Sequence, residues 1–356
     1  MDFTKRNFLA SSLMTLGALG AGEAMAQNAP VQRRGAMYRS FRFSGKQPST
    51  VDHNYKPRRF NKVIELWEDN QPIYYTDARI APGIDPYALG VQMCQTWADA
   101  INVSMEHDVA LDYSALRAFM KGLVDGGPTR SGHRFPCVFT TSPVIGLDEA
   151  YMRANSWVLS SILDCGVMGT HLCHARDAKA VQVAAQMAVR YPFAYPDTPK
   201  LPWEGLRSSS ANYAAEVWGM STNQYVRLAD TWPLNPRGEM IFGCKIEDPY
   251  GVANVDKILD VQGISFTEWG PGDQNYWMNG LAGLPTDGSR IDVETMPNMM
   301  KARSTVLAAA NKRKIRFLNS AGRDVISQLK DGVMVIAGGE ESAITGREYT
   351  KRKMPV

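Results

Sequence analysis

The chain has 356 residues, of which 44% are hydrophobic and 21% are charged, the composition of an ordinary globular protein. With 39 Lys and Arg against 36 Asp and Glu, the formal net charge is only +3, which gives no indication of nucleic-acid binding. The five cysteines are odd in number and form no CxxC pair, so the sequence predicts buried thiols rather than a disulfide scaffold or a zinc site.

The first 26 residues have the pattern of an export signal. A basic start is followed by a weakly apolar stretch and then by Ala24-Met25-Ala26, a small-x-small cleavage site. The stretch "TKRNFL" (residues 4–9) resembles the twin-arginine export motif, with Lys5 in place of the first arginine. We therefore expect export to the periplasm by that route, with no membrane span after removal of the signal.

Residues 27–60 show little periodicity and are expected to form an irregular extension, and a different pattern begins at residue 61. Predicted helices alternate with apolar strands, and the strands cover residues 72–80, 99–106, 134–142, 167–175, 239–248, 264–270, 315–320 and 333–339. Residues 192–219 interrupt the series and are read as one long, proline-rich loop of functional significance.

The strands are continuous apolar runs, which favours a parallel sheet covered by helices on its outer face. About eight strand–helix units over roughly 290 residues fit a (β/α)8 TIM barrel spanning residues 61–356. The alternative is a doubly wound open sheet, but no G-x-G-x-x-G fingerprint opens a strand–helix turn.

Polar residues at the ends of barrel strands are the candidates for chemistry, because active sites form where the βα loops begin. They are Glu106 and His107, His174, Glu247, and Asp273. Carboxylates from two separate strand ends suit a hard divalent ion such as Mg²⁺ or Mn²⁺, with Co²⁺ and Zn²⁺ as alternatives. Each carboxylate could equally be a helix cap or part of a salt bridge, so spacing alone leaves the ligand assignment open.

The sequence also suggests roles for one further acid and for the histidines near these strand ends. Asp248 is a natural N-cap for the helix that follows it. His107 is a candidate general base, although a hydrogen-bonded loop histidine fits the pattern as well. His174 is assigned to substrate binding, whereas His171, three residues earlier on the same strand, is expected to face the surrounding helices.

The motif "KIEDPYGVANVDKILDVQGISFTEWGPGDQN" (residues 245–275) resembles the HpcH/HpaI aldolase and citrate lyase family of metal-dependent pyruvate aldolases. The family pattern Q-I-E-…-G-V-x-N-L-D-x-I-L-x-V-x-G-V-D-…-G-P-A-D-L-S keeps its glycines, Asn-x-Asp, Ile-Leu, Gly-Pro and both acids in register here. Weaker correspondences extend the resemblance over residues 61–345, through "VSMEH", "GTHLCHA" and "RYPFAYP".

The resemblance implies a (β/α)8 barrel whose last helix can be exchanged between subunits of a homo-oligomer (dimer, trimer or hexamer). It implies a divalent metal on Glu247 and Asp273, and binding of a 2-oxo acid carboxylate by backbone N–H groups of Gly272 and Asp273. It further implies that His107 is the acid/base group, with Asp164 as its orienting partner.

Two departures from the family pattern bear on the chemistry. The family has a substrate-binding arginine where this chain has Phe139, which can neither donate a hydrogen bond nor carry charge. Arg134 and Arg207 are the candidates to replace it, and Phe139 becomes part of the expected substrate site. The loop at residues 190–218 is also longer and richer in aromatic residues and proline.

Three functional hypotheses follow from these residues. The first is a carbon–carbon lyase that stabilises an enolate with a divalent metal during (retro-)aldol cleavage of a hydroxy-oxo acid. The second keeps the fold but changes the chemistry, releasing a small aldehyde from a bulkier aromatic substrate. The third is a non-catalytic periplasmic binding protein that retains a metal or an acid ligand.

Overall fold

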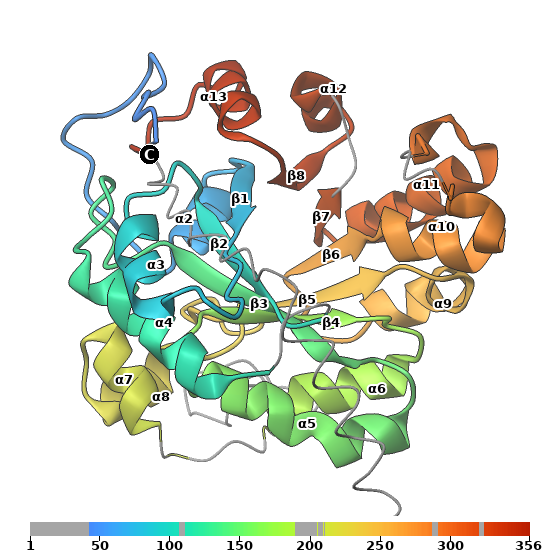
Figure 1. Ribbon diagram of the computed structural model, residues 1–356, viewed down its shortest axis with the longest axis horizontal. Coiled ribbons are helices and arrows are strands. Elements are labelled where there is room, and N and C mark those ends of the chain that lie inside the picture. The colour runs from blue at the N-terminus through green and yellow to red at the C-terminus, as the bar shows by residue number, and fades with distance from the viewer. Residues whose placement is uncertain are drawn as a thin grey trace, which may run out of the picture. The chain divides into compact units, whose positions relative to one another are not determined.

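The computed structural model describes residues 43–106, 111–188, 205, 209, 211–286, 291–319 and 324–356. Eight parallel strands form a closed barrel in chain order (Figure 1). This confirms the predicted (β/α)8 TIM barrel and excludes the open doubly wound sheet. The strands are β1 (Ile73–Asp77), β2 (Ala100–Ser104), β3 (Cys137–Ile145), β4 (Gly169–Cys173), β5 (Ile241–Ile246), β6 (Phe266–Trp269), β7 (Arg316–Asn319) and β8 (Val333–Ala337).

The helices lie outside the barrel, and all but α2 and α13 lie in the connections between strands (Figure 1). They are α2 (Lys62–Glu68), α3 (Pro86–Met93), α4 (Tyr113–Asp125), α5 (Glu149–Leu163), α6 (Ala178–Val183), α7 (Asn212–Trp218), α8 (Thr222–Leu228), α9 (Pro249–Leu259), α10 (Pro271–Asn279), α11 (Pro297–Lys312), α12 (Val325–Lys330) and α13 (Glu340–Tyr349). Short helical turns lie at η1 (Ala184–Ala188), η2 (Gly280–Gly283) and η3 (Val293–Thr295). No helix in the described ranges is both long and apolar enough to cross a bilayer.

The stretch expected to be one long loop ends in a helix. Within residues 192–219, α7 forms because its apolar residues have a hydrophobic surface to cover. Trp218 at its end is buried and stacks on Phe60, with ring centroids 4.5 Å apart, and donates its Nε1–H to the Gly166 carbonyl. All five cysteines are buried free thiols, as expected.

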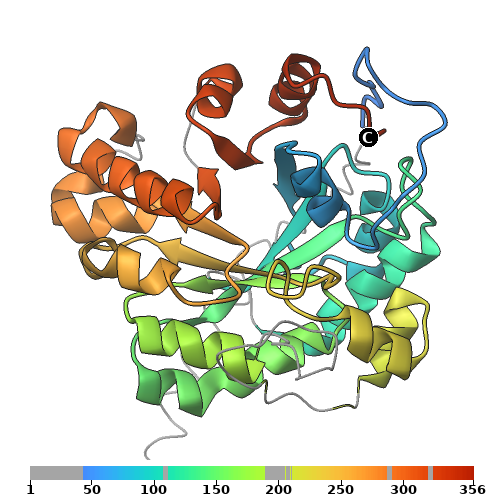
Figure 2. The same ribbon diagram turned by 180° about the vertical axis from the view of Figure 1, so that it is seen from behind.

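The described part of the N-terminal extension, residues 43–60, runs beside the C-terminal segment in both views (Figures 1 and 2). Ser49 hydrogen-bonds to Glu348 through both its backbone N–H and its hydroxyl, and Thr50 donates to the Arg352 carbonyl. In this chain α13 therefore lies on its own barrel, held between the extension and the strands. Exchange of this helix between subunits stays a prediction.

A buried ionic cluster fastens the C-terminal segment to the barrel. Asp99 lies 3.3 Å from the Lys62 ammonium and accepts from Arg352 Nη1 at 2.9 Å, while Arg347 Nη2 lies 3.3 Å away. Burial alone would raise the pKa of Asp99, but Arg347, Arg352 and Lys62 hold it well below its usual range. One carboxylate thus compensates three buried cations, so a substitution that removes its charge is expected to destabilise the fold.

We predict that Asp99→Asn destabilises the protein by about 3–5 kcal/mol, because it leaves three buried cations without a counter-charge. Urea denaturation followed by circular dichroism measures the free energy of unfolding. Asp260→Asn is the matched control, since its carboxylate is exposed beside Arg313 and its loss should change stability little. Equal, small effects of the two substitutions would contradict a central role for Asp99.

Candidate metal and substrate site

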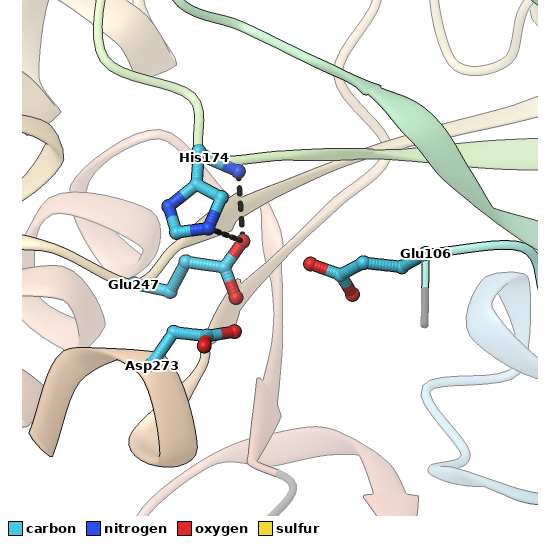
Figure 3. A group of neighbouring side chains, drawn as sticks. All are labelled: Glu106, His174, Glu247 and Asp273. Atoms are coloured by element: carbon cyan, nitrogen blue, oxygen red, sulfur yellow. Dashed lines mark hydrogen bonds and ion pairs between the residues drawn. The ribbon is translucent and has the colours of Figure 1, made fainter. Parts of the chain in front are cut away.

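Four side chains converge at the carboxyl ends of the strands. Glu106 follows β2, His174 follows β4, Glu247 follows β5, and Asp273 lies in the first turn of α10, after β6. One potential ligand atom from each lies within 4.8 Å of the others. In Figure 3 the Glu106 carboxylate points towards those of Glu247 and Asp273 from the opposite side. This end of a (β/α)8 barrel is where active sites form.

The first turn of α10 can lie against the end of β5 because Gly270, the residue before the helix, has no side chain. A Cβ built at Gly270 would lie 2.7 Å from the Glu247 Cβ and 2.8 Å from Glu247 Oε2. Pro271 occupies the first helical position and has no N–H, and no side chain caps the helix. The N–H groups of Gly272 and Asp273 are therefore available at the positive end of the helix dipole.

Lys245 places a positive charge among the carboxylates. Its Nζ lies 2.6 Å from Glu106 Oε2 and 2.8 Å from Glu247 Oε2. Burial works against the charged ammonium, yet the nearby Glu268, Glu247 and Glu106 carboxylates hold the pKa of Lys245 well above its usual value. Lys245 is therefore a fixed cation at the centre of the site.

His174 is held in place by both its backbone and its ring. It adopts a left-handed conformation with φ of 40°, which turns its N–H to donate to Glu247 Oε1 at 2.7 Å. Its Nδ1 lies 3.0 Å from Asp248 Oδ2, and Nε2 lies 3.9 Å from Glu247 Oε1. Burial lowers the pKa of His174, but Asp248, Glu247 and Asp273 outweigh it and raise the pKa overall.

Asp248 is the N-cap that the sequence predicts, and it also contacts the ring of His174. Its Oδ1 accepts from the backbone N–H groups of Tyr250 and Gly251, which begins α9. Its Oδ2 faces His174 Nδ1 and also accepts from Arg176 Nε at 2.6 Å. With Nδ1–H directed to a carboxylate, the Nε2 lone pair of His174 can point at an ion, as in many histidine ligands.

The balance of charge at this site fits a divalent cation. Three carboxylates, on Glu106, Glu247 and Asp273, outnumber the one ammonium, on Lys245, and Glu268 adds a further carboxylate near that ammonium. Burial and the nearby Glu106 carboxylate raise the pKa of Glu247 despite the attraction of Lys245. Oxygen ligands at this density are typical of Mg²⁺ and Mn²⁺ sites.

A cavity of about 260 Å³ lies inside the barrel and shares Glu106 and Lys245 with the cluster. Phe139 lines it and contacts Tyr75 and Phe266, with ring centroids 5.6 and 5.7 Å away. His171 also lines it, so the expectation that this residue faces the helices is wrong. The expectation assumed that side chains alternate from one face of the strand to the other as far as His174. The strand ends at Cys173, however, and the left-handed backbone of His174 breaks this alternation.

Other predicted residues lie elsewhere. Asp164 caps the end of α5 before β4 begins, so it lies at the amino end of the strands, far from the cluster. Arg134 precedes β3 at the same end, and its Nε donates to the Val217 carbonyl. The structure thus gives no geometric support to Asp164 as an orienting partner or to Arg134 as the replacement arginine. His107 and Arg207 lie outside the described residues.

Sequence reasoning missed Lys245 and undervalued Glu106. Lys245 precedes Glu247 by two residues, so the two side chains must face the same side of β5, and a charged residue facing a barrel interior is a functional signal. The family pattern has glutamine at this position, which also marks Lys245 as a departure. Glu106 was recognised at a strand end but not as a possible ligand.

Neither a protein-family model nor a curated protein sequence matches the chain. Solved structures do resemble it, among them an HpcH/HpaI aldolase/citrate lyase family protein from Burkholderia cenocepacia J2315. The two are 18% identical, with a TM-score of 0.57 over 82% of this chain and 97% of that one.

An HpcH/HpaI aldolase from Desulfitobacterium hafniense DCB-2 is 16% identical and has a TM-score of 0.54, over 80% of this chain and 93% of the other. The citrate synthase SbnG is also 16% identical, with a TM-score of 0.52 over 81% and 94% of the two chains. The solved structures that resemble the chain thus include proteins of the family that its motifs resemble. At these identities the likeness establishes a shared fold.

We predict that Glu247→Gln weakens Mn²⁺ binding by more than roughly 10–100-fold, which is the usual loss of metal affinity when a residue that only hydrogen-bonds a ligand is replaced. The amide keeps the shape of the side chain but removes the charge nearest the other ligands. Titration followed by electron paramagnetic resonance measures the free Mn²⁺. Glu149→Gln, an exposed carboxylate beside Arg153 on α5, is the control and should leave the affinity unchanged. Unaltered binding in both variants would remove Glu247 from the metal site.

Proposed function

We propose that the protein is a carbon–carbon lyase that uses a divalent metal in a (retro-)aldol reaction of a hydroxy-oxo acid. The observation that carries this proposal is the convergence of Glu106, His174, Glu247 and Asp273 beside the open N-terminus of α10. Such a site offers ligands for an ion and hydrogen-bond donors for a carboxylate. These are the two elements needed to bind a 2-oxo acid. The structural neighbours that carry the aldolase name support the same reaction class.

The residues divide into two sets by the part of the substrate that they face. Glu106, His174, Glu247 and Asp273 would hold the ion, which when bound would polarise the keto group. The N–H groups of Gly272 and Asp273 would donate to the substrate carboxylate at the helix N-terminus. Holding the carboxylate and keto group in one plane would align the C3–C4 bond, one carbon removed from the keto carbon, for cleavage into an enolate and an aldehyde.

Lys245 takes the electrostatic role that Phe139 cannot perform. Both residues line the same cavity, but only the ammonium can offset negative charge that develops on the substrate oxygen. Its position is fixed by Glu106 and Glu247, so little reorganisation is required during the reaction. His107 remains the proposed acid/base group on the strength of the motif that it shares with the family.

Two exposed aromatic rings beside the cluster favour a second candidate, the release of a small aldehyde from an aromatic substrate. Trp277 is 43% exposed, and its ring centroid lies 6.5 Å from that of His174. Tyr250 is 58% exposed, and the Arg176 guanidinium lies over both rings. A panel of aromatic hydroxy acids assayed for aldehyde release would distinguish this candidate from a pyruvate lyase.

We also propose that the protein is exported through its N-terminal signal and assembles as a homo-oligomer. The signal pattern of residues 1–26 supports export. Sequencing the N-terminus of protein from a periplasmic fraction should find Gln27 first. Light scattering of the same sample would give its mass, and a monomer would remove the oligomer from the proposal.

We predict that the purified protein exchanges the methyl protons of pyruvate for deuterium in D₂O, and only with Mn²⁺ or Mg²⁺ present. Proton NMR follows the loss of the methyl signal. Lys245→Gln should slow the exchange by about 10²–10³-fold, the usual cost of removing one group that stabilises a developing oxyanion. It should also tighten Mn²⁺ binding, because the competing ammonium is gone.

The opposite signs of these two effects make the test specific. A variant that merely unfolds loses both exchange and metal affinity. No exchange by the wild-type protein with metal bound would point to the aromatic reaction or to a non-catalytic binding protein. Exchange without metal would contradict the proposed role of the carboxylate cluster.

A further inference from the structure

The interior of this barrel is unusually polar below the metal cluster. (β/α)8 barrels are normally filled by layers of branched apolar side chains. Here a cavity of about 260 Å³ is lined by eleven residues, eight of them polar: Asp77, Asn102, Ser104, Glu106, Thr141, His171, Lys245 and Glu268, beside Tyr75, Phe139 and Leu318. The space exceeds the roughly 150 Å³ that accommodates benzene in an engineered cavity. A polar chamber of this size can hold a small polar molecule.

His171 is a buried group with unused hydrogen-bonding capacity in the lining of this chamber. It is only 1% exposed, and its Nε2 has no hydrogen-bond partner among the residues that the structure describes. On the other side of the ring, Nδ1 lies 3.5 Å from Glu268 Oε2. Burial, with the nearby Lys245 ammonium, lowers the pKa of His171 well below its usual value, so the ring is neutral.

A neutral imidazole whose Nδ1–H faces a carboxylate presents the Nε2 lone pair as an acceptor. A buried acceptor without a donor is costly, and a hydroxyl group entering the chamber would supply the missing hydrogen bond. The carboxylates of Asp77 and Glu268 add further acceptors and disfavour an anion. The lining therefore selects a neutral molecule with hydroxyl groups.

We propose that this chamber binds the aldehyde fragment of the lyase reaction, and that this fragment is a short, neutral hydroxyaldehyde whose hydroxyl donates to His171. The proposal rests on the function proposed above. The chamber shares Glu106 and Lys245 with the metal cluster, so an aldehyde carbon at its mouth would lie beside a 2-oxo acid held at α10. His171 then determines specificity, and Glu268 is a positioning residue that orients its ring.

The test compares glycolaldehyde with acetaldehyde, which differ only by one hydroxyl, as acceptors for pyruvate in the aldol direction with Mn²⁺. We expect the wild-type kcat/KM to favour glycolaldehyde by about 10²-fold or more, because a site built for a hydroxyl rejects the analogue that lacks it. His171→Leu should reduce this preference to below about 10-fold, chiefly through activity with glycolaldehyde. His171→Gln, whose amide can still accept, should restore part of it.

Thr170→Val is the matched control on the same strand. Its hydroxyl contacts Thr140 rather than the chamber, so the preference should not change. A wild-type enzyme that uses both aldehydes equally, or a His171→Leu variant that keeps the full preference, would overturn the proposal.

A binding experiment separates failure of this proposal from failure of the proposed function. Protein labelled with ¹⁵N-histidine and loaded with Mg²⁺ is titrated with each aldehyde, and the Nε2 signal of His171 is followed by NMR. A shift with glycolaldehyde but not with acetaldehyde supports the chamber even if no aldol product forms. No shift with either, in a protein that does exchange pyruvate protons, rejects the chamber and leaves the lyase function standing.

Discussion

Three carboxylates and one histidine hold their ligand atoms within 4.8 Å at one end of the barrel, and this concentration of negative charge is the constraint on which the site depends. Like charges at such distances repel strongly when they are shielded from water. Lys245 offsets one of them through contacts to Glu106 and Glu247. The carboxylates still outnumber this cation, and a divalent ion would restore the balance.

The fold supplies this arrangement by topology. Parallel strands in chain order place every strand end on one face, so residues far apart in sequence meet there without long loops. Close approach of β5 and α10 depends on Gly270, and the orientation of His174 depends on its left-handed backbone and on Asp248. At the opposite end, the cluster around Asp99 joins the C-terminal segment to the strands and closes the barrel away from the chemistry.

The sequence predicted the features that depend on hydrophobic periodicity and on strand ends. It was less successful for residues whose position depends on the local direction of the backbone. Glu247 and Asp273 were found because acids follow two apolar strands. His171 was misplaced because its side was counted from His174, which lies beyond the end of the strand. Asp164 was assigned from a motif, and it lies where α5 ends before β4 begins; its pairing with His107, which is outside the described residues, stays a prediction. Helix α7 was hidden in a proline-rich stretch, since tertiary contacts such as the packing of Trp218 on Phe60 and its hydrogen bond to Gly166 stabilise it.

The most direct test of the account is a crystal grown or soaked with Mn²⁺ and measured for anomalous scattering. The account predicts one strong peak between Glu106, His174, Glu247 and Asp273, with oxygen ligands at about 2.0–2.3 Å, typical of hard divalent ions. The Lys245 ammonium should remain beside the carboxylates without ligating the ion. A crystal with no peak there at saturating Mn²⁺ would contradict the central claim that this group of side chains is a metal site.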